Sequence, residues 1–132
     1  MKTSVLLYNF TAEENKRWTA ALAALPEVRQ VIVDKEQYAA PLCELLDGTP
    51  AAVSAPYAGA GDFAERMLVM EGVDSMLFDF LLRLCDMITG ENVLRAIVTD
   101  TNRNWNSIYL HEQLMEEERQ VRAWQMQRGD KK

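Results

Sequence analysis

The chain has 132 residues, of which 48% are apolar and 26% charged, as expected for one globular domain. Its formal net charge of -6 argues against nucleic acid or an anionic membrane as the main partner, because both bind clustered Lys and Arg. The sequence lacks a signal-peptide pattern, a membrane-spanning apolar stretch and a Cys-x-x-Cys pair, so we expect a cytoplasmic protein with no metal and no cofactor.

The first part of the chain predicts a strand, a helix and a second strand. A nearly continuous apolar run at 4–8 is typical of a strand buried on both faces. Thr11 and Glu14 have the spacing of a capping box, so a helix is expected to begin there and to end before Pro26. The second strand is expected at Val28–Val33.

A weaker helical pattern follows at 36–46. Its regular part is expected to begin near Ala40, and Gly48 is a plausible C-terminal cap. The segment 49–61 is rich in Ala, Pro and Gly, which predicts a loop. We therefore expect a connecting helix and loop over 36–64.

The strand, helix and strand order then returns. The third strand is expected at 66–70, and Asp74 is placed to cap an apolar helix over 76–88 that Gly90 ends. The fourth strand is expected at 94–99. Because this helix is apolar almost all round, we expect the last helix or another subunit to cover it.

A long helix is predicted over 104–127, followed by a short tail at 129–132. Four apolar residues of this helix keep a three–four spacing that Glu117 interrupts: Leu110, Leu114, Val121 and Trp124. Two interpretations remain open. The end of the helix lies against its own domain, or it forms a dimer or partner interface.

The two strand–helix–strand segments predict a duplication within a single α/β domain that spans residues 1–128. Repeat one covers 4–35 and repeat two covers 66–101. Their second strands align as Arg29–Asp34 against Arg95–Asp100. This similarity describes the fold and leaves the function open.

Two sheet topologies fit this element order. In the favoured one, an α+β sandwich, the repeats interleave into a ferredoxin-like antiparallel sheet of four strands through a pseudo-twofold axis, with an extra helix between the repeats. In the alternative, four parallel strands form a doubly wound sheet with helices on both faces. The duplication favours the first topology, and the helix between the repeats favours the second.

The densest polar cluster lies between the fourth strand and the last helix. Exposed amides at a helix N-terminus favour anions, so a small anionic ligand is one hypothesis for this turn. The candidate ligand-binding residues are Thr99, Thr101, Asn102, Arg103 and Trp105. The other interpretation is structural, because Thr, Asp and Asn also cap helices and build turns.

Thr101-Asn102-x-x-Trp105 follows the β-rich segment 96–99 and precedes Leu110 and the acidic segment 112–118. With the Met67–Met70 strand, this pattern resembles the bacterial family filed as domain of unknown function 3783. The resemblance covers the second half best. It implies no reaction, cofactor or catalytic residue, and it suggests that Thr99 also belongs to the family signature.

No catalytic set is evident. His111 is the only histidine, and its helical neighbours four residues away are Ser107 and Met115, so that spacing supplies no carboxylate. The sequence favours a protein-interaction or regulatory module without catalysis, acting through the C-terminal helix as a possible homodimer. A small anionic-ligand binder or enzyme with its site at the polar turn is the alternative.

Overall fold

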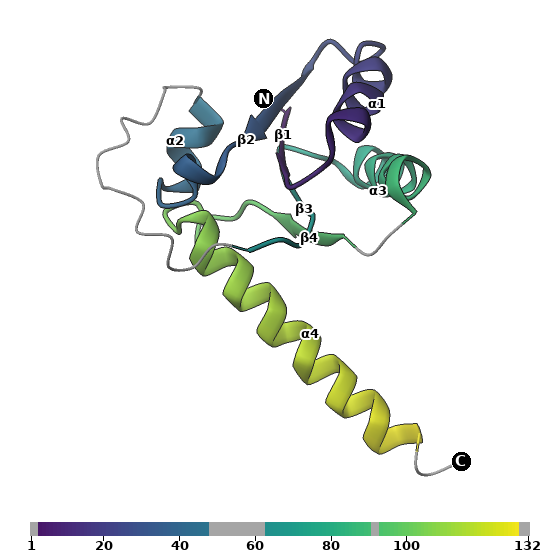
Figure 1. Ribbon diagram of the computed structural model, residues 1–132, viewed down its shortest axis with the longest axis vertical. Helices are drawn as coiled ribbons and strands as arrows, with labels where there is room; N and C mark the ends of the chain where they lie inside the picture. Colours follow the sequence, from purple (N-terminus) through teal and green to yellow (C-terminus); the bar gives the residue numbers. More distant parts are fainter. Residues whose placement is uncertain (1–2, 48–62, 91–92, 130–132) are drawn as a thin grey trace.

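The computed structural model describes residues 3–47, 63–90 and 93–129. Within them, a four-stranded mixed sheet carries helices on both faces, and a long last helix leads away from the body (Figure 1). The predicted α/β class, with four strands and a long C-terminal helix, is confirmed. The loop expected at 49–61 and tail residues 130–132 lie outside the described residues.

The elements follow the predicted order, and the strands lie in the order β2-β1-β3-β4. Their bounds are β1 Thr3–Tyr8, α1 Ala12–Leu22, β2 Val28–Val33, the short 3-10 helix η1 Lys35–Gln37, α2 Leu42–Asp47, β3 Met67–Glu71, α3 Ser75–Thr89, β4 Leu94–Ile97 and α4 Ser107–Gly129.

Local capping signals set the ends of α1 and α3. The Thr11 hydroxyl accepts the Glu14 amide and the Glu14 carboxylate accepts the Thr11 amide, which completes the predicted capping box. Asp74 accepts the Leu77 amide at the start of α3. Gly90 ends α3 at φ 64°, a left-handed conformation that glycine adopts without a steric penalty.

The central strands β1 and β3 are buried on both faces, so their alternate side chains enter two different cores. One core packs under α1 and α3 and includes Val5, Leu7, Leu68, Met70, Trp18, Leu81 and Cys85. The other packs under α2 and the start of α4 and includes Leu6, Tyr8, Met67, Val69, Tyr38, Leu45 and Leu110. The molecule therefore has three layers, with the sheet in the middle.

Strand pairing shows twofold symmetry between the two repeats. β1 and β3 run antiparallel, and Leu6 lies opposite Val69 at the centre of their ladder. Rotation about an axis through this pair exchanges the two outer, parallel ladders. The matching pairs are Ser4–Arg29 with Met67–Leu94, Val5–Gln30 with Leu68–Arg95, Leu6–Val31 with Val69–Ala96, and Leu7–Ile32 with Met70–Ile97.

This register corrects the repeat alignment drawn from the sequence. Matching Arg29–Asp34 with Arg95–Asp100 is wrong by one residue, because the ladders place Gln30 at the position of Arg95. Side chains alternate along a strand, so a shift of one residue moves every side chain to the opposite face. In the corrected alignment, Ile32 and Ile97 are equivalent, and their exposed fractions are similar, 48% and 42%.

The sheet combines features of the two expected topologies, and the pairing differs from both. The strands within each repeat pair directly and in parallel, and only the β1–β3 contact is antiparallel. Helices α1 and α3 supply the crossover connections that neighbouring parallel strands need. The repeats therefore meet edge to edge, and the predicted interleaving does not occur.

Helix α2 belongs to the repeat and is the counterpart of the first turns of α4. An isolated antiparallel bridge joins Pro41 to Asn106, just before each helix. Leu45 and Leu110 follow at the same distance from this bridge, and both are buried in the same core. The expectation of an extra helix inserted between the repeats is wrong in this respect.

The last helix begins at Ser107, three residues later than the predicted Asn104. The carbonyls of Arg103 and Trp105 accept hydrogen bonds from the first two amides of α2, at 2.9 and 2.8 Å. These contacts and the bridge between Pro41 and Asn106 fix residues 103–106 against the start of α2, and the regular helix begins only at Ser107.

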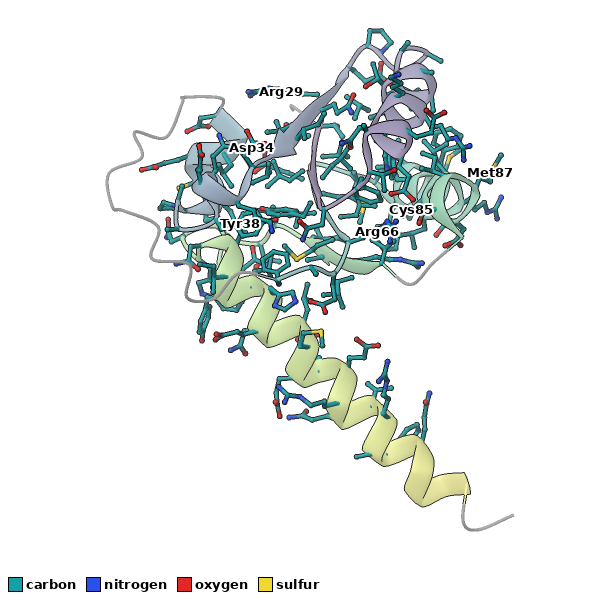
Figure 2. The ribbon with its side chains drawn as sticks, in the orientation of Figure 1. Arg29, Asp34, Tyr38, Arg66, Cys85 and Met87 are labelled. Atoms are coloured by element: carbon teal, nitrogen blue, oxygen red, sulfur yellow. The ribbon has the colours of Figure 1, made fainter. Side chains whose placement is uncertain are left out.

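Helix α3 leaves an apolar stripe exposed. Met76, Phe80 and Met87 have exposed fractions of 83%, 48% and 80%. Figure 2 shows Met87 at the outer side of α3, away from the sheet. The prediction that the last helix covers α3 is wrong, because α4 packs on the opposite face of the sheet. Cover by another subunit stays a prediction.

Glu14 links the two repeats. Its carboxylate accepts both the Thr11 amide and the Arg66 guanidinium, at 2.9 and 2.8 Å, and only 12% of its side chain is exposed. Burial by itself raises the pKa of Glu14, but the hydrogen bonds from Arg66 and Thr11 outweigh burial and lower the pKa below its ordinary value.

Glu14→Gln is expected to lower the free energy of unfolding at pH 7 by about 1–3 kcal/mol, the usual range for a charged hydrogen bond. A carboxyl whose folded pKa is lowered stabilises the fold above its unfolded pKa, near 4.5, and loses this effect as pH falls. Urea unfolding at neutral and acidic pH should therefore show the variant's deficit shrinking below about pH 4.5. A deficit that is constant over this range would contradict the assignment.

Candidate interaction surface on the C-terminal helix

The start of α4 is firmly attached to the body. The Tyr8 hydroxyl and the Ser107 hydroxyl form a buried hydrogen bond of 2.7 Å. Burial raises the pKa of the Tyr8 phenol although the bond to Ser107 acts in the opposite sense, so the phenol stays neutral. Asn106 caps the helix by accepting the Tyr109 amide at 2.8 Å, and Leu110 is buried in the core below.

The predicted ligand-binding turn is held together by its own side chains. The Asn102 side-chain oxygen accepts the Thr99 backbone amide at 2.8 Å, and the Thr99 hydroxyl accepts the Asn102 backbone amide at 3.2 Å. The Asn102 side-chain amide donates to the Ile97 backbone carbonyl at 3.1 Å. Asp34 and Gln37 occupy the positions in repeat one that correspond to Thr99 and Asn102. The Asp34 backbone amide donates to the Gln37 side-chain oxygen at 2.9 Å, as the Thr99 amide does to Asn102. The turn is therefore a feature of the repeat.

The remaining residues of this turn differ in their exposure. Thr101 is exposed, whereas Arg103 and Trp105 are half-buried. The Trp105 ring packs at the edge of the Tyr109 ring, with centroids 4.7 Å apart. The Ser107 amide, at the start of α4, donates to the Tyr38 carbonyl at 3.0 Å. These contacts within the protein account for the residues found in the turn. They therefore give little support to the hypothesis of a bound ligand.

Asn102→Ala is expected to lower the free energy of unfolding by about 1–2 kcal/mol, because the Thr99 amide and the Ile97 carbonyl lose their partner. Thermal or urea unfolding measures the loss. Thr101→Ala, at an exposed position in the same turn, is the matched control and should change stability by less than about 0.5 kcal/mol. Equal effects of the two substitutions would argue against the structural role of Asn102.

His111 has a carboxylate partner that its own helix does not supply. The His111 Nε2 atom lies 2.7 Å from the Glu65 carboxylate, and its ring stacks on Phe63 with centroids 4.0 Å apart. Glu65 and Phe63 belong to the segment before β3. Sequence reasoning missed this pair because it examined only helical neighbours, whereas the two residues are 46 positions apart. The pair holds α4 to the body at the point where the helix leaves it.

Beyond His111, a groove of about 620 Å³ opens between α4 and the edge strand β4. Its apolar lining residues are Val93, Leu94, Leu114, Met115 and Val121. Its charged lining residues include Glu65, Arg95, Glu118 and Arg122. The groove therefore combines apolar and charged side chains, a composition that suits a side chain from another protein.

The distal half of α4 projects away from the body, as Figure 1 shows. Residues 119–125 are all exposed. Two ion pairs within the helix, Glu116–Arg119 at 2.9 Å and Glu118–Arg122 at 2.7 Å, lie at the beginning of this segment. Of the four predicted interface residues, Leu110 is buried and Leu114 half-buried, whereas Val121 and Trp124 are 51% and 55% exposed. The structure thus divides this set between the domain and the solvent.

No group of three metal-ligating side chains occurs in residues 3–47, 63–90 and 93–129. In the same part of the chain, no helix combines the length and the apolar character needed to cross a membrane.

Comparisons with protein-family models, with curated proteins and with solved structures find no match for this chain. The resemblance of residues 96–118 to domain of unknown function 3783 stays a prediction.

Proposed function

We propose that this protein is a non-catalytic interaction module that associates with a second copy of itself through α4. The observation that carries the proposal is the projecting half of that helix, where Val121 and Trp124 are more than half exposed. Large apolar side chains on a helix outside the core commonly mark a protein–protein contact.

The projecting segment also needs support to stay helical. Isolated helices shorter than about 12–15 residues are marginal in water, and residues 119–125 are all exposed. The two exposed ion pairs contribute only a few tenths of a kcal/mol each. Burial of the Trp124 indole at an interface would add on the order of 2 kcal/mol.

The charges of α4 favour a second copy as the partner. Residues 112–118 contain four Glu and no basic residue, whereas residues 119–128 contain three Arg and no acidic residue. The helix is therefore self-complementary, because a second copy running in the opposite direction brings each acidic half next to a basic half.

Sedimentation velocity of the full chain over roughly a hundredfold concentration range tests the proposal, because self-association must rise with concentration. Trp124→Glu is expected to give a monomer. Met76→Glu is the matched control, because it places the same carboxylate on an exposed apolar position of α3. It should leave the dimer intact. A monomeric full chain, or dissociation by Met76→Glu alone, would contradict the assignment to α4.

A further inference from the structure

The spacing of α4 and the position of the groove point to one arrangement of the two copies. Leu114, Glu117, Val121 and Trp124 recur at intervals of three and four residues, the pattern of a helix that packs along another helix. When two such helices run antiparallel, the first core position of each heptad faces the second core position of the partner. With this spacing, Leu114 faces the partner's Trp124, and Val121 faces the partner's Glu117.

Building on the proposed function, we propose that two copies pair antiparallel along α4, and that Trp124 of each copy enters the groove between α4 and β4 of the other. Leu114 is one of the residues that line this groove. The residue that the helix pairing places opposite the partner's Trp124 therefore lies beside a cavity. The spacing of α4 and the shape of the surface lead independently to the same contact.

The groove has the size and the chemistry for an indole. Its volume of about 620 Å³ exceeds what one Trp side chain fills, so part of the partner's helix can enter with it. Val93 and Leu94 provide apolar contact from the β4 side. Arg95 also lines the groove, and its guanidinium, which pairs with Asp86 at 3.1 Å, can pack on an aromatic face.

The same arrangement aligns opposite charges. In this register, Glu116 lies at the level of the partner's Arg122, so the acidic segment 112–118 runs along the basic segment 119–128 of the other copy. A parallel pair would instead place like charges side by side, which costs free energy. Charge therefore selects the antiparallel direction.

Glu117 limits the affinity of this pair. It occupies a core position opposite the partner's Val121, and a carboxylate in an apolar contact is costly when it has no partner charge. Glu117→Leu is expected to tighten the dimer at least about tenfold, read from the concentration dependence of sedimentation. Unchanged or weaker association would place Glu117 outside the contact.

Disulfide trapping tests the direction of the helices. E117C and V121C chains of different mass, each also carrying C43S, are mixed and oxidised. Cys85 can stay, because it is fully buried and burial raises its pKa to about 11, so it remains an unreactive thiol. The antiparallel arrangement predicts the mixed disulfide between the two chains as the main product. A parallel pair predicts the two homodimeric disulfides instead.

Sedimentation of the same reduced mixture separates this inference from the proposed function. A dimer that yields mainly homodimeric disulfides, or no disulfide, overturns the antiparallel arrangement and leaves α4-mediated association standing. A monomeric mixture whose parent chain is also monomeric overturns both. If only the substituted chains are monomeric, E116C and R122C are used in the same way, because these exposed residues are paired by the same register.

Discussion

A chain that ends at Glu118 is expected to be a monomer at concentrations where the full chain is a dimer. The deletion removes Val121, Trp124 and the basic half of α4, while Leu110 and the contacts at the helix start remain. The removed residues up to 125 are exposed, so the free energy of unfolding should fall by less than about 1 kcal/mol. Sedimentation velocity measures the association, and urea unfolding measures the stability.

A chain that ends at residue 129 is the matched control, because it loses only the last three residues. It should associate as the full chain does. If the chain ending at Glu118 keeps its dimer, the interface lies elsewhere, and the exposed stripe of α3 becomes the leading candidate. A large loss of stability on deletion would instead mean that the distal half of α4 supports the fold of the body.

Trp18→Ala is expected to lower the free energy of unfolding by about 3–5 kcal/mol, the usual loss for an aromatic residue in a core. Trp18 is a fully buried residue of α1, and its ring packs edge-on against the Phe10 ring with centroids 5.7 Å apart. The total free energy of unfolding of a small domain is only about 5–15 kcal/mol, so the variant should be close to unfolding at room temperature. Urea or thermal unfolding checks the value.

Trp18→Leu is the variant to compare with Trp18→Ala. By the twofold relation of the repeats, Trp18 is equivalent to Leu81, which is also fully buried. Leu fills part of the space and removes an indole N–H that has no hydrogen-bond partner within the described residues. Its loss of stability should therefore be clearly smaller than that of Ala. Equal losses would mean that the core cannot adapt at this position.

Local patterns in the sequence predicted the elements of this fold because the interactions that form them are local. The capping box at Thr11, the Asp74 cap and the left-handed Gly90 are each decided by residues within one helical turn. Strand Val28–Val33 was predicted to the residue, and the apolar run at 4–8 correctly indicated that β1 is buried on both faces.

The pairing of the strands could not be predicted from the sequence, because it depends on contacts between residues that are far apart in the chain. Matching Arg29 with Arg95 gave a plausible alignment whose register is shifted by one residue, since chemical identity carries no information about the face of a strand. The late start of α4 has the same cause, because Arg103, Trp105 and Asn106 are held by contacts with residues 41–43.

The three–four spacing on the last helix left two interpretations open, contact with its own domain or with a partner. The structure buries Leu110 in the body and leaves Val121 and Trp124 more than half exposed, a division that the spacing alone does not predict. Neither the groove beside β4 nor the Glu65–His111 contact had a signal in the sequence. Both arise where α4 passes the edge of the sheet, and the position of α4 there depends on how its first turns pack in the core.

Because of the twofold axis through Leu6 and Val69, the two halves of this single chain are arranged like the two subunits of a homodimer. An ancestral chain half as long would have left one side of β1 open, and two identical molecules would have closed it by pairing along that strand. Fusion of two such genes would preserve the sheet and free each half to diverge. The two halves differ in their last helices, which are Leu42–Asp47 in the first half and Ser107–Gly129 in the second.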